Sequence, residues 1–124
     1  MSEVEEEIEL AEEALKDLEV MQDASLRRRY TTLYFSVYHA ARAALISMQY
    51  APKTHSGLDS LVHNILANKE GLIEEEEAQY FSKLKTRREQ ADYETGFFGD
   101  EEEFAELKDA AEELVEKLRG IAED

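Results

Sequence analysis

The sequence predicts an all-α fold: an antiparallel, up-and-down bundle of four or five helices. Apolar residues recur at spacings of three and four through most of the 124-residue chain, as they do on the buried face of a helix. No stretch of useful length alternates between apolar and polar residues with a period of two, so strands are not expected. The segments between the helical patterns are short, and short connections favour antiparallel neighbours.

The first helix is predicted over residues 3–22, with the glutamates outside. Its apolar residues follow a 4,3,4,3 rhythm and make one stripe, which is typical of a surface helix in a bundle. They are Val4, Ile8, Ala11, Leu15 and Leu18. The pattern breaks at residues 23–25, where Asp23 or Ser25 can cap the next helix.

The second helix, from Leu26 to about Tyr50, is predicted to be the central one because it contains no Asp or Glu. Its apolar residues are not confined to one stripe: Tyr30 and Val37 lie on one side, and Phe35 on another. A helix that is apolar most of the way round must be covered on several sides, by its own bundle or by a second subunit as well.

A short helix should follow Pro52, the residue that ends the central helix. Thr54 or Ser56 can cap this short helix, and Gly71 would close it in the left-handed conformation. Its inward residues are predicted to be Leu58, Leu61, Val62 and Ile65.

Two long helices complete the bundle. The first should begin near Glu74 and end at residues 93–95, before a loop at residues 96–99 in which two glycines flank two phenylalanines. Asp100 and Glu103 resemble a capping box at the start of the last helix. That helix has the clearest apolar stripe of the chain: Phe104, Leu107, Ala111, Leu114, Leu118 and Ile121.

The composition predicts one soluble domain that spans residues 1–124. Apolar residues make up 43% of the chain and eleven are aromatic, which suffices for a core. The absence of cysteine excludes disulfides, thiolate metal sites and cysteine nucleophiles. No apolar run approaches the roughly 20 residues that a bilayer requires, so we expect a cytoplasmic protein with no membrane association.

The net charge of −16 at pH 7 hides two basic islands. Residues 24–69 contain six Lys or Arg against one acid, Asp59, and a second island follows at Lys83, Lys85, Arg87 and Arg88. Brought together, the islands could form a positive concavity for a nucleic acid or nucleotide on an acidic body. Alternatively, these cations pair with the surplus carboxylates.

Arg88 is the residue that most needs a partner. It shares a helical stripe with Phe81, Leu84 and Ala91, a face that otherwise appears buried. A buried guanidinium cannot be deprotonated, so it must meet a carboxylate, carbonyl groups, a second subunit or a bound anion. Asp92, one turn further on, is the nearest candidate.

Three histidines can titrate near neutral pH, and two of them are candidates for a site. His39 and Arg42 lie three residues apart on one helical face, where they can converge on one anion or one hydrogen-bond network. His55 lies in a turn close to Lys53, which favours contact with a phosphate. The sequence contains no Gly-rich phosphate loop, nucleophile elbow or HExxH motif, and it predicts no metal and no cofactor.

Three blocks resemble the small prokaryotic HEPN proteins: HAARA at residues 39–43, PKTHSG at residues 52–57, and RREQADY at residues 87–93. The resemblance covers roughly residues 8–120. It implies a helical bundle that forms a homodimer and often pairs with a minimal nucleotidyltransferase in toxin and antitoxin modules. Many HEPN toxins are metal-independent ribonucleases with an R-x4-6-H motif. In this chain Tyr93 stands five residues after Arg88, and a tyrosine of pKa about 10 is a poor general base at pH 7.

Three functional hypotheses follow. The favoured one is a dimeric HEPN module that binds a nucleotide or RNA phosphate through Arg88, Asp92 and Tyr93 with Arg42, Lys53 and His55, and that has a nucleotidyltransferase partner. The second is a ribonuclease whose catalytic candidates are Arg88 and Tyr93 together with His39 or His55. The third is a structural dimerisation module in which Arg88 and Asp92 form a buried ion pair.

Overall fold

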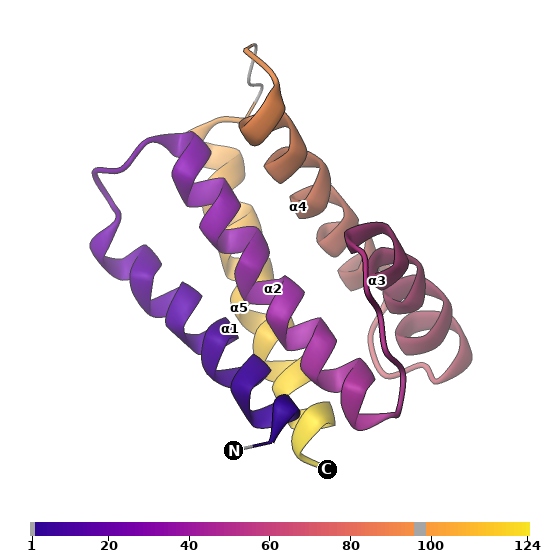
Figure 1. Ribbon diagram of the computed structural model, residues 1–124. Coiled ribbons are helices and arrows are strands. Elements are labelled where there is room, and N and C mark those ends of the chain that lie inside the picture. Colours follow the sequence, from indigo (N-terminus) through magenta and orange to yellow (C-terminus); the bar gives the residue numbers. More distant parts are fainter. Residues whose placement is uncertain (1, 96–98) are drawn as a thin grey trace.

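The structure, a computed structural model, describes residues 2–95 and 99–124 (Figure 1). Within these two ranges there are five α-helices, one π-helix and no strand. In chain order they are α1 (Glu3–Val20), α2 (Leu26–Ser47), α3 (His55–Leu61), η1 (Val62–Lys69), α4 (Glu75–Tyr93) and α5 (Glu101–Glu123). The four long helices lie side by side, with α1 and α4 running opposite to α2 and α5 (Figure 1). The predicted all-α, up-and-down bundle is confirmed.

Helix α2 is the centre of the bundle, as its composition predicts. It packs against α1, α4 and α5 (Figure 1), so its apolar residues are covered on several sides within a single chain. Tyr30, Leu33, Tyr34 and Val37 are completely buried. Four alanines follow along the same helix, at positions 40, 41, 43 and 44, and all are buried at close approaches of the neighbouring helices.

The short helix predicted after Pro52 consists of α3 and a π-helical continuation, η1. Leu58, Val62 and Leu66 are spaced by four residues and are all buried. On a regular α-helix each step of four residues rotates a side chain by about 40°, so three such residues would drift off one face. The wider π-turn keeps them on the core side. Gly71 ends the element with φ +60°, the left-handed conformation that was predicted.

Helix α1 ends at Val20 rather than at residue 22, and two further features of the helix ends differ from the predictions. Helix α2 ends at Ser47 rather than near Tyr50, because Gln49 adopts φ 70° and the Tyr50 N–H turns back to the Leu45 carbonyl, 2.9 Å away. At α5, the Asp100 side chain accepts from the Glu103 N–H at 2.6 Å. The Glu103 carboxylate does not return to the Asp100 backbone but binds Arg87 and Tyr30, so only half of the capping box forms.

The end of α4 is held by an arginine from α2. Arg27 donates to the carbonyl oxygens of Ala91 at 2.5 Å, Glu94 at 2.7 Å and Thr95 at 3.1 Å. These carbonyls belong to the last turn and the residues after it, where a helix has no N–H donors of its own for its terminal carbonyl groups. The loop predicted at residues 96–99 lies outside the described residues, except for Gly99.

The core joins all six elements. Phe81 and Leu84 of α4 are completely buried, as are Leu58 and Leu66, and α5 contributes Leu114 and Leu118. In the part of the chain that the structure describes, no helix is long and apolar enough to span a membrane.

Candidate functional site

The candidate site lies where α2, the start of α3 and the middle of α4 meet. Arg88 enters it from the buried face of α4, one turn after Leu84, and its side chain is 17% exposed. Arg88 Nε lies 3.0 Å from Asp92 Oδ2, but its N–H does not point at that oxygen and has no hydrogen-bond acceptor. Within residues 2–95 and 99–124 the guanidinium of Arg88 donates no hydrogen bond.

Aromatic rings of α2 form the wall against which Arg88 packs. Its guanidinium carbon lies 5.9 Å from the ring centroid of Tyr34 and 5.7 Å from that of Phe35. Contacts of this kind stabilise a cation but give its N–H groups no acceptors. A mostly buried guanidinium with open donors favours an anion, because a phosphate or carboxylate can accept two of its hydrogen bonds at once.

His55 approaches the same rings from α3. It is the first residue of that helix, whose N-terminus is capped by Thr54 through a 2.8 Å hydrogen bond from the Gly57 N–H. His55 Nδ1 and Tyr34 Oη lie 2.7 Å apart, and the ring of His55 packs 4.7 Å from that of Tyr38. His55 Nε2 has no hydrogen-bond partner among the described residues and remains open to a ligand.

The protonation of His55 follows from its surroundings. Burial lowers the pKa of His55, and the positive charges of Arg88 and Lys85 lower it further. The imidazole is therefore neutral at pH 7. Burial also raises the pKa of Tyr34 well above its usual value, so this hydroxyl keeps its proton beside the histidine.

Lys85 is a second cation of the site. Its side chain is 16% exposed, and Nζ donates to Glu89 Oε1 at 2.7 Å, one turn along α4. Sequence reasoning placed Lys85 in a basic island but not at this site, and it assigned no role to Tyr34 or Glu89. The available signal was the spacing of Tyr34, Phe35 and Tyr38, which places three aromatic side chains on one part of α2 next to a histidine.

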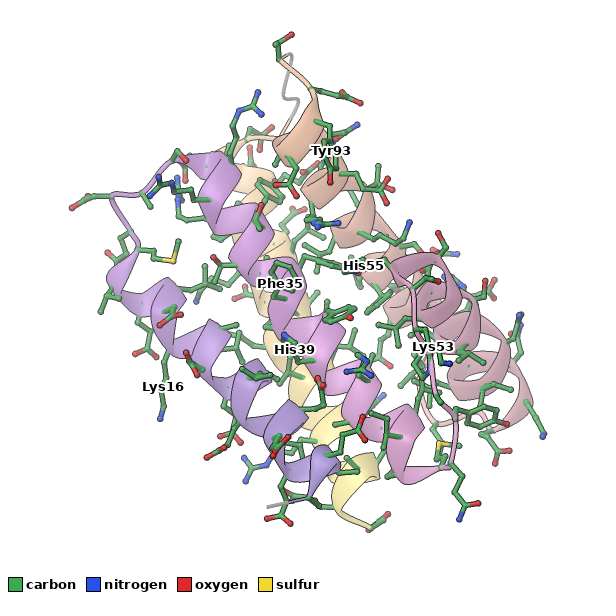
Figure 2. All side chains as sticks on the ribbon, in the orientation of Figure 1. Lys16, Phe35, His39, Lys53, His55 and Tyr93 are labelled. Atoms are coloured by element: carbon green, nitrogen blue, oxygen red, sulfur yellow. The ribbon has the colours of Figure 1, made fainter. Side chains whose placement is uncertain are left out.

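His39 and Arg42 converge, as predicted, but on a carboxylate of this chain. His39 Nδ1 lies 2.6 Å from Glu7 Oε2, and Arg42 binds the other oxygen of Glu7, whose side chain is only 9% exposed. This network holds α1 against α2. The ring of His39 also stacks on Phe35, with centroids 5.9 Å apart, and Figure 2 shows both residues along α2.

The other predicted site residues take different positions. Asp92 accepts a hydrogen bond from Thr31 Oγ1 at 3.3 Å, in addition to its ion pair with Arg88. Lys53 is exposed on the connection to α3, two residues before His55, and has no partner in the described part of the chain (Figure 2). Tyr93 is 79% exposed at the end of α4 and makes no hydrogen bond or ring contact with Arg88 or His55 there.

Most arginines of the basic islands pair with acids. Arg87 donates twice to Glu103 of α5, at 2.8 Å each. Arg29 makes a two-pronged pair with Glu101. The surplus carboxylates therefore neutralise these arginines by hydrogen-bonded ion pairs. The acidic partner of Arg88 is Asp92, to which it donates no hydrogen bond.

Comparison with known proteins gives two findings. A family model described as "HEPN domain" matches residues 8–121. A Methanocaldococcus jannaschii protein with the name "Putative toxin MJ0605" is 31% identical over 113 residues, which are 90% of this chain and 83% of that protein.

Proposed function

Since the chain belongs to the HEPN domain family, we propose that it is a toxin-like module that binds the phosphate of a nucleotide or RNA at Arg88. The observation that carries the proposal is the open guanidinium: Arg88 is largely buried against Tyr34 and Phe35 and donates no hydrogen bond to a described residue. Leaving such donors without acceptors is unfavourable, and a phosphate removes that cost.

The neighbours of Arg88 suit a phosphate. Lys85 adds a second positive charge, and the neutral His55 offers Nε2 for a hydrogen bond. Asp92 lies beside the guanidinium without saturating it, because Arg88 Nε is 3.0 Å from Asp92 Oδ2 but donates no hydrogen bond to it. Arg42 is outside this set, since Glu7 already occupies its guanidinium.

Phosphate binding is tested by calorimetric titration with inorganic phosphate and with adenosine monophosphate. We expect Arg88→Ala to weaken binding roughly tenfold or more, the effect of losing a charge-assisted hydrogen-bond pair. Arg88→Lys keeps the charge but not the planar, forked guanidinium, so its phosphate affinity should lie between those of the unmodified protein and Arg88→Ala. Arg119→Ala is the matched control, because Arg119 pairs with Glu12 and Glu123 on α1 and α5. Equal binding by the Arg88 and Arg119 variants would leave the structural ion-pair hypothesis as the better one.

The proposal includes two protein partners, a second copy of this chain and a minimal nucleotidyltransferase. Membership of the family supports both proposals without showing either. Phe35 and Tyr38 support self-association, because these large rings are only half-buried within one chain. Sedimentation at several concentrations tests the homodimer, and a monomer at all of them contradicts it. Co-purification with a minimal nucleotidyltransferase of the source organism tests the second partner.

A second candidate function, RNA cleavage, is favoured by the position of His55. The motif around Arg88 lacks a histidine, but His55 reaches the same aromatic wall from α3 and carries an open Nε2. In the tautomer that donates Nδ1–H to Tyr34, Nε2 can accept the proton of a ribose 2′-hydroxyl. The 2′-oxygen then attacks the phosphorus, and the bond to the 5′-oxygen breaks while Arg88 holds the phosphate. The products are a 2′,3′-cyclic phosphate and a 5′-hydroxyl whose proton comes from water.

Cleavage is tested with a fluorescent RNA in the presence of a chelator. If His55 is the base, His55→Ala and Arg88→Ala abolish cleavage and His39→Ala does not, since His39 is held by Glu7. If the unmodified protein binds the RNA but does not cleave it, this second function is wrong and the phosphate-binding function remains.

A further inference from the structure

A pocket of about 420 Å³ lies beside Asp92, between the first turns of α2 and the last turn of α4. Arg27, Arg28 and Thr31 line it from α2, and Ala91 and Asp92 line it from α4. These two helix ends adjoin near the top of Figure 1 and are tied together by the hydrogen bonds of Arg27. The volume is in the range of small-ligand sites.

The charge of this pocket sets it apart on an acidic protein. Two arginines line it against one carboxylate, Asp92, which is itself paired with Arg88. Four other pockets on the described surface have more carboxylates than cations in their walls. An anionic ligand is therefore repelled from those pockets and attracted to this one.

Arg28 is the cation of the pocket that is available to a ligand. Its neighbours are occupied: Arg27 binds the carbonyls at the end of α4, and Arg29 binds Glu101. The side chain of Arg28 is exposed and makes no ion pair or hydrogen bond in the described part of the chain. Arg28 is thus left without a counterion among the described residues, although thirty acidic residues are present in the chain against only fourteen Lys and Arg.

We propose that this pocket is a second nucleotide subsite, which holds the nucleotide next to the one whose phosphate binds Arg88. The inference rests on the proposed function and extends it: the preferred ligand is a single-stranded oligonucleotide rather than a mononucleotide. Asp92 borders both places, because one oxygen faces Arg88 and the other accepts from Thr31 in the pocket wall.

Each wall of the pocket has a role toward such a ligand. Arg28 binds the phosphate of the second nucleotide. Asp92 Oδ1 retains acceptor capacity for an amino group of the base or a ribose hydroxyl, since a carboxylate has about four acceptor positions. Met21 and Ala91 provide apolar contact for the flat face of the base.

The test compares adenosine monophosphate with the dinucleotide pApA, in which a 2′-O-methyl group at the internal linkage prevents cleavage. We expect the unmodified protein to bind the dinucleotide more tightly. Arg28→Ala should weaken dinucleotide binding by about tenfold and monophosphate binding by less than twofold. It should also reduce the salt dependence of log K for the dinucleotide by about 0.7, the value for one lost phosphate contact with a single strand.

Lys16→Ala is the matched control, because Lys16 also is exposed, lacks an ion pair in the described residues, and lies on α1 away from α4 (Figure 2). Equal binding of the two ligands, or equal effects of Arg28→Ala and Lys16→Ala, would overturn the subsite while Arg88-dependent phosphate binding stands. If the unmodified protein binds neither ligand, the proposed function itself fails.

Discussion

At the scale of residues, the side chains of Arg88 and His55 share the same two aromatic neighbours. Both contact Tyr34 and Phe35, although they come from different helices. The rings shield Arg88 from water and leave its donors unmatched, while burial and the nearby cation keep His55 neutral. These open donors are the feature on which the proposed phosphate binding rests.

The lowered pKa of His55 predicts a pH dependence of stability. The folded protein binds a proton at His55 less readily than the unfolded chain, so folding is disfavoured as the pH falls below the unfolded pKa of about 6.5. We expect the loss of stability between pH 7 and pH 5, measured by urea unfolding, to be smaller in His55→Gln than in the unmodified protein. His63→Gln is the control, and an equal loss in all three proteins would contradict the prediction.

Glu103 contributes to the pH dependence of stability as a carboxylate whose pKa is lowered by folding. Its hydrogen bonds with Arg87 lower its pKa to about 2, and the hydrogen bond from Tyr30 acts in the same direction. This contribution to stability is complete above the unfolded pKa of about 4.5 and is lost as the pH falls toward 2. Glu103→Gln should therefore cost about 1–2 kcal/mol at pH 7, the cost of a charge-assisted hydrogen bond.

The measurement is urea unfolding of Glu103→Gln and the unmodified protein at pH 7 and at pH 3. The difference between the two proteins should shrink at pH 3, because this pH lies below the unfolded pKa of about 4.5 and the Glu103 carboxyl is protonated in the unfolded chain. Glu102→Gln, in the same turn of α5 but exposed, is the control and should change stability little at either pH. A difference that persists undiminished in acid would show that Glu103 acts through packing.

At the scale of elements, the end of α4 depends on Arg27. Three carbonyls that the helix cannot satisfy itself accept hydrogen bonds from this one side chain of α2. Arg27→Ala should release the last turn of α4, and hydrogen exchange at residues 91–95 should become at least tenfold faster. Arg28→Ala, one residue along, is the control and should leave exchange there unchanged. Unchanged exchange in Arg27→Ala would show that the turn is held by other contacts.

Element boundaries were predictable to within about three residues where a cap or the sole proline marked them. Ser25 and Thr54 cap α2 and α3, as the sequence indicated. The π-turns of η1 were not predictable from local propensity, because they form to keep a four-residue apolar spacing against the core of the bundle. The half-formed capping box at Glu103 has the same origin: a distant arginine competes successfully for its carboxylate.

At the scale of the whole molecule, the net charge of −16 opposes compaction. Local ion pairs oppose this effect, but pairs within one helix such as Lys108–Glu112 and Arg119–Glu123 are exposed and contribute little. Raising NaCl from 0.01 to 0.1 M shortens the screening length from about 30 Å to about 10 Å. We expect the melting temperature to rise over this interval while phosphate affinity at Arg88 falls. Sucrose at the same osmolality is the control, because it is excluded from the protein surface but does not screen charge. A lower melting temperature in salt would contradict the prediction.

The sequence by itself determined the fold class, the central place of α2 and the inward position of Arg88, because each depends on apolar periodicity and composition within one segment. Only the tertiary structure decided which partners meet. His39 and Arg42 bind Glu7, while His55 joins Arg88 at Tyr34. Apolar periodicity assigns a residue to a face of its helix. Contacts between residues 21 to 35 positions apart depend on how the helices are rotated and staggered against one another, and the packing of the whole core sets that arrangement.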